Sequence, residues 1–191
     1  MKEIILKGNW KAGWAIDLHT ISSVPLGDGK FNTIYTPIGG ALNGLKYHHD
    51  FSQASILSKY AIDFLKTRLV VKYLNVILPV PPSVLEREHQ PVYEVAERIG
   101  SHLQIPVDMQ YLFKKKETSQ LKNIDDQNER DNLLKEAFNI KNKRYKNMKI
   151  LLFDDLYRSG STLKAITDIL YTEGKVQNVY VLTLTKTRVK K

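Results

Sequence analysis

The amino-acid sequence predicts an α/β fold in which helices flank a parallel β-sheet. Two observations support this class. Several apolar runs lack polar alternation, which suits strands buried on both faces, and stretches with helical spacing separate these runs between residues 51 and 185. Such alternation is typical of parallel strands joined by right-handed helical crossovers. At 191 residues the chain has the length of a single domain.

In chain order, residues 1–50 look irregular, because short strand-like runs alternate with turn chemistry such as Gly39-Gly40. Residues 51–68 have the spacing of an amphipathic helix, and residues 70–80 contain a buried strand that ends in a proline-rich turn. The later elements are a helix over 91–103, short strands at 105–107 and 111–113, a helix near 129–137, a strand at 150–153, a helix from 161 and a last strand over 178–185.

The stretch KILLFDDLYRSGST, residues 149–162, carries the most information on function. An apolar strand is followed by two adjacent carboxylates, Asp154 and Asp155, and then by a short loop that enters a helix. In open α/β sheets, ligands bind at the carboxyl ends of the strands, and a helix N-terminus attracts phosphate. Gly160 would let the backbone approach such an anion closely. The loop also offers hydroxyl donors, from Ser159, Ser161 and Thr162.

Two carboxylates beside this loop would repel a phosphate, but they would accept hydrogen bonds from sugar hydroxyls, directly or through a bound magnesium. The pattern therefore predicts a pocket for a ribose 5-phosphate, with the anion at the loop and the diol at the acids. The alternative is a surface turn after a core strand, with solvated acids. The apolar strand before the motif and the apolar helix after it favour the pocket.

FDDLYRSGST resembles the phosphoribosyl-diphosphate (PRPP) signature of type I phosphoribosyltransferases. The resemblance implies that Asp154 and Asp155 are the catalytic pair and hold the ribose 2′ and 3′ hydroxyls. It implies that the 5′-phosphate is bound by the loop, namely by Ser159, Gly160, Ser161 and Thr162, with Arg158 beside them as a candidate. Arg158 stands where 6-oxopurine enzymes of this family carry the aspartate that handles the base proton, and arginine cannot act as a base.

The chain therefore does not resemble a hypoxanthine or guanine salvage enzyme. Three roles for Arg158 stay open: contact with an acidic acceptor, contact with the 5′-phosphate, and an outward solvated charge. The acids themselves are expected to be partly exposed, so that Asp155→Asn would weaken PRPP binding with little effect on folding.

A second segment, residues 77–99, reads ILPVPPSVLEREHQPVYEVAERI. Its proline-rich turn with a following arginine resembles the ComF-like branch of the same family, in which this loop contacts the pyrophosphate of PRPP. The resemblance implies pyrophosphate-binding roles for Pro82, Ser83 and Arg87. The usual continuation Arg-Gly-Phe-Asn-Gln is replaced here by residues 88–91, in which only Gln90 corresponds. An ordinary strand-to-helix connection is the alternative.

A third segment, residues 114–138, resembles the ComF-like pattern of a mobile lid, which implies lid roles for Lys116, Thr118 and Gln120. A lid also suits the chemistry, because water would capture the oxocarbenium-like state of glycosyl transfer unless the site closed first. Lysines on this segment would deliver charge to the departing pyrophosphate. A solvated loop without a role is the alternative.

Composition excludes several classes. There are no cysteines, so disulfides, thiolate zinc sites and cysteine nucleophiles are ruled out, and a cytoplasmic location is expected. No apolar run is long enough to span a bilayer, so no membrane partner is expected. The net charge of +9 raises nucleic acid as a partner. However, the basic residues lie in short runs, no nucleic-acid motif is present, and PRPP itself requires a positive field.

Two smaller patterns have competing interpretations. The His48-His49-Asp50 sequence offers metal-ligand types, but a surface turn is favoured because the remaining histidines lack a matching spacing. Trp10, Trp14 and Tyr35 would either stack on a base or fill the core of the N-terminal region.

Together, the resemblance implies one phosphoribosyltransferase-type domain over residues 1–191, with a hood over 1–50 and a core over 51–185. It implies magnesium-dependent displacement of pyrophosphate from PRPP by a nitrogenous acceptor, with Mg²⁺ carried by PRPP near Asp154 and Asp155 rather than by direct protein ligands. Neither the acceptor nor a general base can be assigned. The alternatives are a non-catalytic PRPP- or nucleotide-binding module linked to DNA uptake or repair, and a hydrolase that uses water. The oligomeric state is open, and a dimer is compatible with the sequence.

Overall fold

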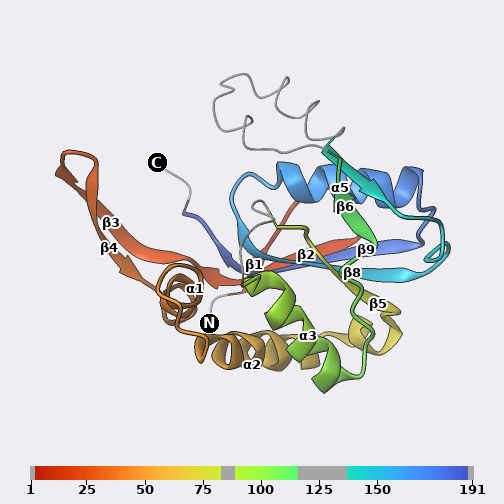
Figure 1. The fold of residues 1–191 in the computed structure, drawn as a ribbon, viewed down its shortest axis with the longest axis horizontal. Helices are drawn as coiled ribbons and strands as arrows, with labels where there is room; N and C mark the ends of the chain where they lie inside the picture. Colours follow the sequence, from red (N-terminus) through yellow and green to blue (C-terminus); the bar gives the residue numbers. More distant parts are fainter. Residues whose placement is uncertain (1–2, 83–88, 116–136, 189–191) are drawn as a thin grey trace.

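The computed structural model describes residues 3–82, 89–115 and 137–188. Within these residues the centre of the molecule is a five-stranded sheet in the order β1-β2-β9-β8-β5 (Figure 1). Four neighbouring strands run parallel, and β1 pairs antiparallel with β2. The strands are β1 (Ile4–Ile5), β2 (Ala12–Leu18), β5 (Val76–Pro79), β8 (Lys149–Tyr157) and β9 (Asn178–Lys186). The expected α/β class is confirmed.

Helices cover both faces of this sheet (Figure 1). Along β8, Ile150 and Leu152 point to one face and pack with α5, while Leu151 and Phe153 point to the other and pack with α1, α2 and α3. This alternation places two apolar layers around one sheet. The helices are α1 (Pro37–Tyr47), α2 (Gln53–Lys66), α3 (Pro91–Leu103) and α5 (Ser161–Thr172), with a 3₁₀ turn η1 at Leu69–Tyr73.

Two small antiparallel sheets complete the described fold. The strands β3 (Thr20–Gly27) and β4 (Lys30–Tyr35) form a hairpin that reaches away from the body of the molecule (Figure 1). The strands β6 (Leu112–Lys114) and β7 (Phe138–Ile140) flank the segment 115–137.

The N-terminal region differs from the expected hood. The strand β2 lies inside the central sheet, paired with β9 from Ala12↔Tyr180 to Leu18↔Lys186, so residues 12–18 belong to the sheet and not to a hood. The helix α1 was not predicted, because Gly39-Gly40 indicates a turn. Here Thr36 caps the helix by accepting a hydrogen bond from the Gly39 amide at 3.0 Å, and Pro37 begins it. Glycine is needed at 39 for space, since a Cβ there would lie 1.9 Å from the His19 carbonyl oxygen.

The motif strand is also longer than its apolar run. The strand β8 continues to Tyr157 and pairs with β9 through Asp154↔Thr183 and Tyr157↔Lys186. The two acids therefore belong to a central strand instead of following it, which fixes their backbone within the sheet. Several predicted positions lie outside the described residues: Ser83, Arg87, Lys116, Thr118, Gln120 and most of the helix expected near 129–137.

Candidate functional site

Polar residues gather where the parallel strands end. Asp154 and Asp155 are the sixth and seventh of the nine residues of β8, Thr185 is next to last in β9, and His19 directly follows β2. Pro82, the one described member of the expected pyrophosphate group, follows β5 and is half-buried. Because carboxyl ends of parallel strands share one edge of a sheet, these residues define a candidate site there.

The carboxylate of Asp155 is buried and ion-paired. Its side chain is 9% exposed, and its Oδ2 atom lies 2.5 Å from Nζ of Lys46, which stands in the last turn of α1 and is 20% exposed. The expectation of a partly exposed acid is therefore wrong for Asp155. Removing one partner of a buried pair leaves an uncompensated charge, so a neutral substitution at Asp155 will lower the stability of the fold.

Asp154 is half-buried, and it has a different electrostatic environment from its neighbour. Its Oδ1 atom accepts a hydrogen bond from the Asp155 amide at 2.8 Å. Burial, and next the negative charge of Asp155, raise the pKa of Asp154 to about 7, against the opposing effect of Lys46 and Lys114. Near neutral pH, Asp154 can therefore either donate or accept a hydrogen bond, as suits a sugar hydroxyl.

The loop after β8 opens directly into α5. Gly160 is the N-cap residue and adopts φ +81°, and the Ser161 amide donates to Oγ of Ser159 at 3.4 Å. The following first-turn amides, of Thr162 and Leu163, have no acceptor within the helix. They provide the converging N–H groups and positive helix end that an anion requires.

The turn at Gly160 is packed tightly on the strand that precedes it. A Cβ at this position would lie 2.6–2.7 Å from the hydroxyl and ring of Tyr157. Trp10, in turn, meets the Tyr157 ring edge-on at a centroid distance of 6.5 Å. The sheet and the β1–β2 connection therefore hold the loop from below. On its outer side, Arg158 and Ser159 are exposed.

His19 is a site residue that sequence reasoning missed. The Thr185 hydroxyl donates to the Asp155 carbonyl oxygen at 3.3 Å, and the same hydroxyl lies 3.2 Å from Nδ1 of His19. A hydroxyl has one hydrogen and a carbonyl can only accept, so a neutral His19 must donate from Nδ1. Its Nε2 atom then carries a lone pair, and within the described residues it has no hydrogen-bond partner.

The charge state of His19 follows from its surroundings. Burial first, then the positive charge of Lys46 and that of Arg158, lower the pKa of His19, while Asp155 opposes them. Tyr35 meets the ring edge-on at 5.4 Å. The imidazole is therefore kept neutral near pH 7. No local sequence signal marks this residue, because it joins the site only through the placement of β2 beside β9.

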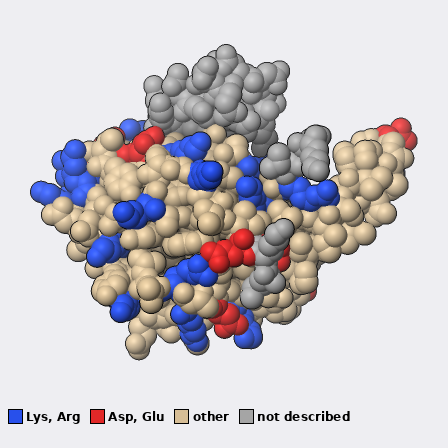
Figure 2. Space-filling model, turned by 180° about the vertical axis from the view of Figure 1, so that it is seen from behind, with Lys and Arg blue, Asp and Glu red and all other residues tan. Residues whose placement is uncertain are grey.

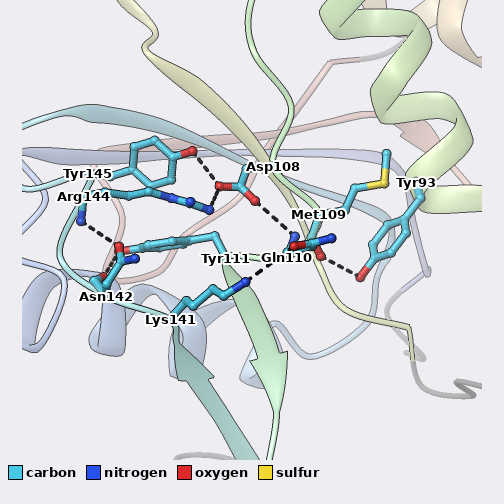
Figure 3. A network of polar contacts seen from close by, with 9 residues as sticks. All are labelled: Tyr93, Asp108, Met109, Gln110, Tyr111, Lys141, Asn142, Arg144 and Tyr145. Atoms are coloured by element: carbon cyan, nitrogen blue, oxygen red, sulfur yellow. Dashed lines mark hydrogen bonds and ion pairs between the residues drawn. The ribbon is translucent and has the colours of Figure 1, made fainter.

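Lys114 adds a second cation next to the acids. It ends β6 and is half-buried; burial lowers its pKa, and the charge of Asp154 opposes that effect. Figure 3 shows what anchors the segment leading to it: Asp108 binds Arg144 and accepts from the Tyr145 hydroxyl at 2.6 Å, and the Tyr111 hydroxyl donates to the Asn142 carbonyl at 2.9 Å. This network fixes the start of β6.

The residues do not form a cage for a metal. Among the residues that the structure describes, no three acids or histidines cluster closely enough to hold an ion. Lys46 forms an ion pair with the carboxylate of Asp155, and Asp154 is only partly ionised near pH 7. This donor set fits hydroxyl groups, or a magnesium ion that arrives on its substrate, better than a cation held by the protein alone.

The remaining predicted candidates have structural roles. Trp10 is buried and donates to the Leu6 carbonyl at 2.9 Å, and Trp14 stacks on Tyr180 at 6.4 Å, so both indoles pack in the core. Asp50 accepts hydrogen bonds from Ser52 and Gln53 at the start of α2, as expected of a surface turn.

The charged surface does not indicate a further binding site outside the carboxyl edge of the sheet. On the face shown in Figure 2, Lys and Arg side chains are scattered among neutral residues and form no single stripe. No helix in the described parts of the chain is long and apolar enough to cross a membrane.

No family model matches the chain, and no curated protein matches its sequence. Among solved structures, the chain resembles adenine phosphoribosyltransferase from Trypanosoma brucei in complex with AMP, pyrophosphate and ribose-5-phosphate. The identity is 12%, with 88% of this chain and 87% of that chain covered and a TM-score of 0.48. It also resembles a hypothetical protein from Neisseria gonorrhoeae with bound ppGpp, at 11% identity, 74% and 71% coverage and a TM-score of 0.47.

A third likeness is to UMP synthase from Leishmania donovani, at 16% identity over 84% of this chain with a TM-score of 0.42. The chain spans only 27% of that enzyme. These likenesses are distant, and the proposals below depend on the residues of the chain itself.

Proposed function

We propose that this protein binds PRPP at the carboxyl edge of its sheet and transfers the phosphoribosyl group to a nitrogenous acceptor, releasing pyrophosphate. The observation that carries the proposal is the left-handed turn at Gly160, which opens the N-terminus of α5 shortly after the acid pair of β8, in which Asp155 is buried and Asp154 half-buried. This arrangement supports an anion site at the start of α5 and a hydroxyl site at the acids, close to each other along the chain.

The loop and the acids would bind different parts of the substrate, the phosphate and the ribose. The amides of Thr162 and Leu163, with the hydroxyls of Ser159 and Ser161, would hold the 5′-phosphate. Asp154 and Asp155 would hold the ribose hydroxyls, as the sequence motif implies. Two fully ionised acids would repel an anionic substrate. The site weakens this repulsion, because Lys46 neutralises Asp155 and Asp154 is partly protonated near pH 7.

The leaving group would face the end of β5. The expected pyrophosphate residues, Pro82, Ser83 and Arg87, and the expected lid residues, Lys116, Thr118 and Gln120, remain part of the proposal. When bound together with PRPP, Mg²⁺ supplies charge neutralisation for the departing pyrophosphate. Positioning and electrostatic stabilisation would provide most of the rate enhancement.

The acceptor must lose a proton, and His19 is suited to take it. In the transfer, the acceptor nitrogen bonds to the anomeric carbon, the bond from that carbon to the pyrophosphate oxygen breaks, and the nitrogen proton passes to Nε2 of His19. The hydrogen bond from Nδ1 to Thr185 holds the imidazole in the required tautomer. Arg158, at the family's usual base position, cannot perform this step.

Isothermal titration with PRPP and Mg²⁺ tests the function, together with a pyrophosphate-release assay over a panel of nitrogenous bases. We expect saturable PRPP binding, competition by ribose 5-phosphate, and release that depends on one acceptor. Binding without release for any acceptor would favour a non-catalytic module, and release without an acceptor would favour a hydrolase. Failure of both PRPP and ribose 5-phosphate to bind would overturn the proposal.

The His19→Asn variant tests the proton acceptor. Asparagine can still donate to Thr185 from its amide but has no basic nitrogen, so kcat/KM for pyrophosphate release should fall about 100-fold. PRPP affinity should stay within about threefold of wild type, because His19 faces the acceptor in this mechanism. The acidic limb of the pH–rate profile should change in shape, because of the two groups only Asp154, with its pKa of about 7, would still titrate there. His102→Asn, in the last turn of α3, is the control and should change none of these. An unchanged rate and acidic limb in His19→Asn would exclude the role.

A further inference from the structure

The hairpin of β3 and β4, here called the arm (Thr20–Tyr35), stands apart from the rest of the molecule (Figure 1). Among the described strands, β3 and β4 pair only with each other. The body holds the arm at its base, where the Thr36 hydroxyl donates to the Leu18 carbonyl at 2.6 Å and Arg188 donates to the Ile21 carbonyl at 2.7 Å. Beyond its base, the hairpin is a two-stranded ribbon surrounded by solvent.

The arm exposes more apolar surface than such a ribbon can sustain in water. Five of its large hydrophobic side chains are more than half exposed: Ile21, Val24, Leu26, Phe31 and Ile34. The pairs Pro25↔Phe31 and Val24↔Asn32 are adjacent in register, so they point to opposite faces, and both faces carry apolar side chains. An isolated two-stranded hairpin is at best marginally stable, and a contiguous exposed apolar surface marks an interaction site.

We propose that the arm packs against the arm of a second copy of this chain, forming a two-fold symmetric dimer. Charge favours this occupant. The arm contains one acid and one base, Asp28 and Lys30, whereas the whole chain carries a net charge of +9. A nucleic acid or an anionic membrane would be met by several Lys and Arg side chains. A neutral arm can meet its own copy without the repulsion that two basic bodies would experience.

The area of the arm also suits this arrangement. Its five exposed hydrophobic side chains each offer roughly 100 Å², so two arms carry on the order of 1,000 Å² of apolar surface over their two faces. A dimer in which the arms cover both faces would come close to the lower limit for a specific interface. The outer edges of β3 and β4 have backbone groups available for pairing, which would extend the contact. A two-fold axis satisfies both arms with the same surface.

The arm and the candidate site are physically connected. Tyr35 at the end of β4 contacts the ring of His19, and the Thr36 amide donates to the His19 carbonyl oxygen at 3.3 Å. Dimerisation would therefore steady the backbone beside the acids. The proposal does not depend on the proposed enzymatic function, because it follows from the exposure, register and charge of the arm alone.

Sedimentation equilibrium of the full-length protein tests the proposal. We expect a dimer at about 10 μM, and a Phe31→Asp variant whose dimer dissociation constant is at least about tenfold higher. Leu69→Asp is the matched control, because Leu69 is 85% exposed on η1, outside the arm, and should leave the dimer intact. Leu26→Asp provides a second arm variant in case Phe31→Asp fails to fold, as checked by circular dichroism.

Hydrogen exchange on the wild-type protein locates the interface without a substitution. Amides of residues 20–35 should gain protection between about 1 and 100 μM protein, while those of α3 should not. A monomer at every concentration overturns the proposal, and so does a dimer that Phe31→Asp and Leu69→Asp affect equally. Binding of a nucleic acid or anionic vesicles by a monomer, if lost in Phe31→Asp, would assign the arm to that partner instead.

Discussion

Replacing Gly160 with valine is expected to abolish PRPP binding, raising the dissociation constant by more than about 100-fold. Gly160 adopts φ +81°, which branched side chains disfavour, and a Cβ would lie 2.6 Å from the Tyr157 hydroxyl. Tyr157 belongs to a central strand and cannot move away easily, so the loop must shift instead. The amides at the start of α5 would then no longer converge on the phosphate. Isothermal titration measures the loss directly.

A second glycine provides the control for this experiment. Gly29, at the tip of the arm, adopts φ +72°, but nothing lies within 4 Å of its Cβ position. Gly29→Val should therefore show the backbone strain of about 1 kcal/mol in the free energy of unfolding, with PRPP affinity unchanged. Equal loss of affinity in both variants, or unchanged affinity in Gly160→Val, would remove the loop from the proposed site.

The loop could be predicted because its signals are local. Glycine, small hydroxyl residues and an apolar strand and helix on either side lie within one short stretch, and each favours the same structure. The helix α3 was predicted with its observed bounds, Pro91–Leu103, for the same reason: a starting proline and a regular apolar face. These elements require no knowledge of the rest of the chain.

The electrostatics of the site could not be predicted, because its cations come from distant segments. Lys46 reaches Asp155 only because α1 packs beside the edge of the sheet, and the Gly39-Gly40 pair concealed that helix. His19 arrives through β2, a strand whose sequence AGWAIDL gives little sign of a central position. Sequence alone therefore indicated two similar, partly exposed acids. In the fold, Asp155 is the ion-pair partner of Lys46, and Asp154 has a raised pKa.

Because the two acids differ, two substitutions that each remove one charge, Asp154→Asn and Lys46→Met, should change the free energy of unfolding in opposite directions. An aspartate has a pKa of about 3.9 in an unfolded chain, whereas Asp154 has a raised pKa of about 7 in the fold. The folded state thus binds this proton more tightly. The contribution of Asp154 to stability is most favourable below about pH 4 and is progressively lost as the pH rises towards 7. Above pH 7, an ionised Asp154 destabilises the fold.

Asp154→Asn should therefore stabilise the protein at pH 8, by about 2 kcal/mol in the free energy of unfolding, after allowance for residual solvent. The gain should vanish near pH 4, where wild-type Asp154 is already neutral.

Lys46→Met also removes one charge, but it leaves Asp155 buried without its partner and should lower stability at pH 8 by about 2–3 kcal/mol. Urea unfolding at both pH values measures these differences. Asp154→Asn should also weaken PRPP binding at least about tenfold, because one carboxylate oxygen that can accept from a ribose hydroxyl becomes an amide nitrogen that cannot. If Asp154→Asn showed the same stability relative to wild type at pH 4 and pH 8, Asp154 would be an ordinary solvated acid, and the two acids of β8 would no longer support a sugar-binding site.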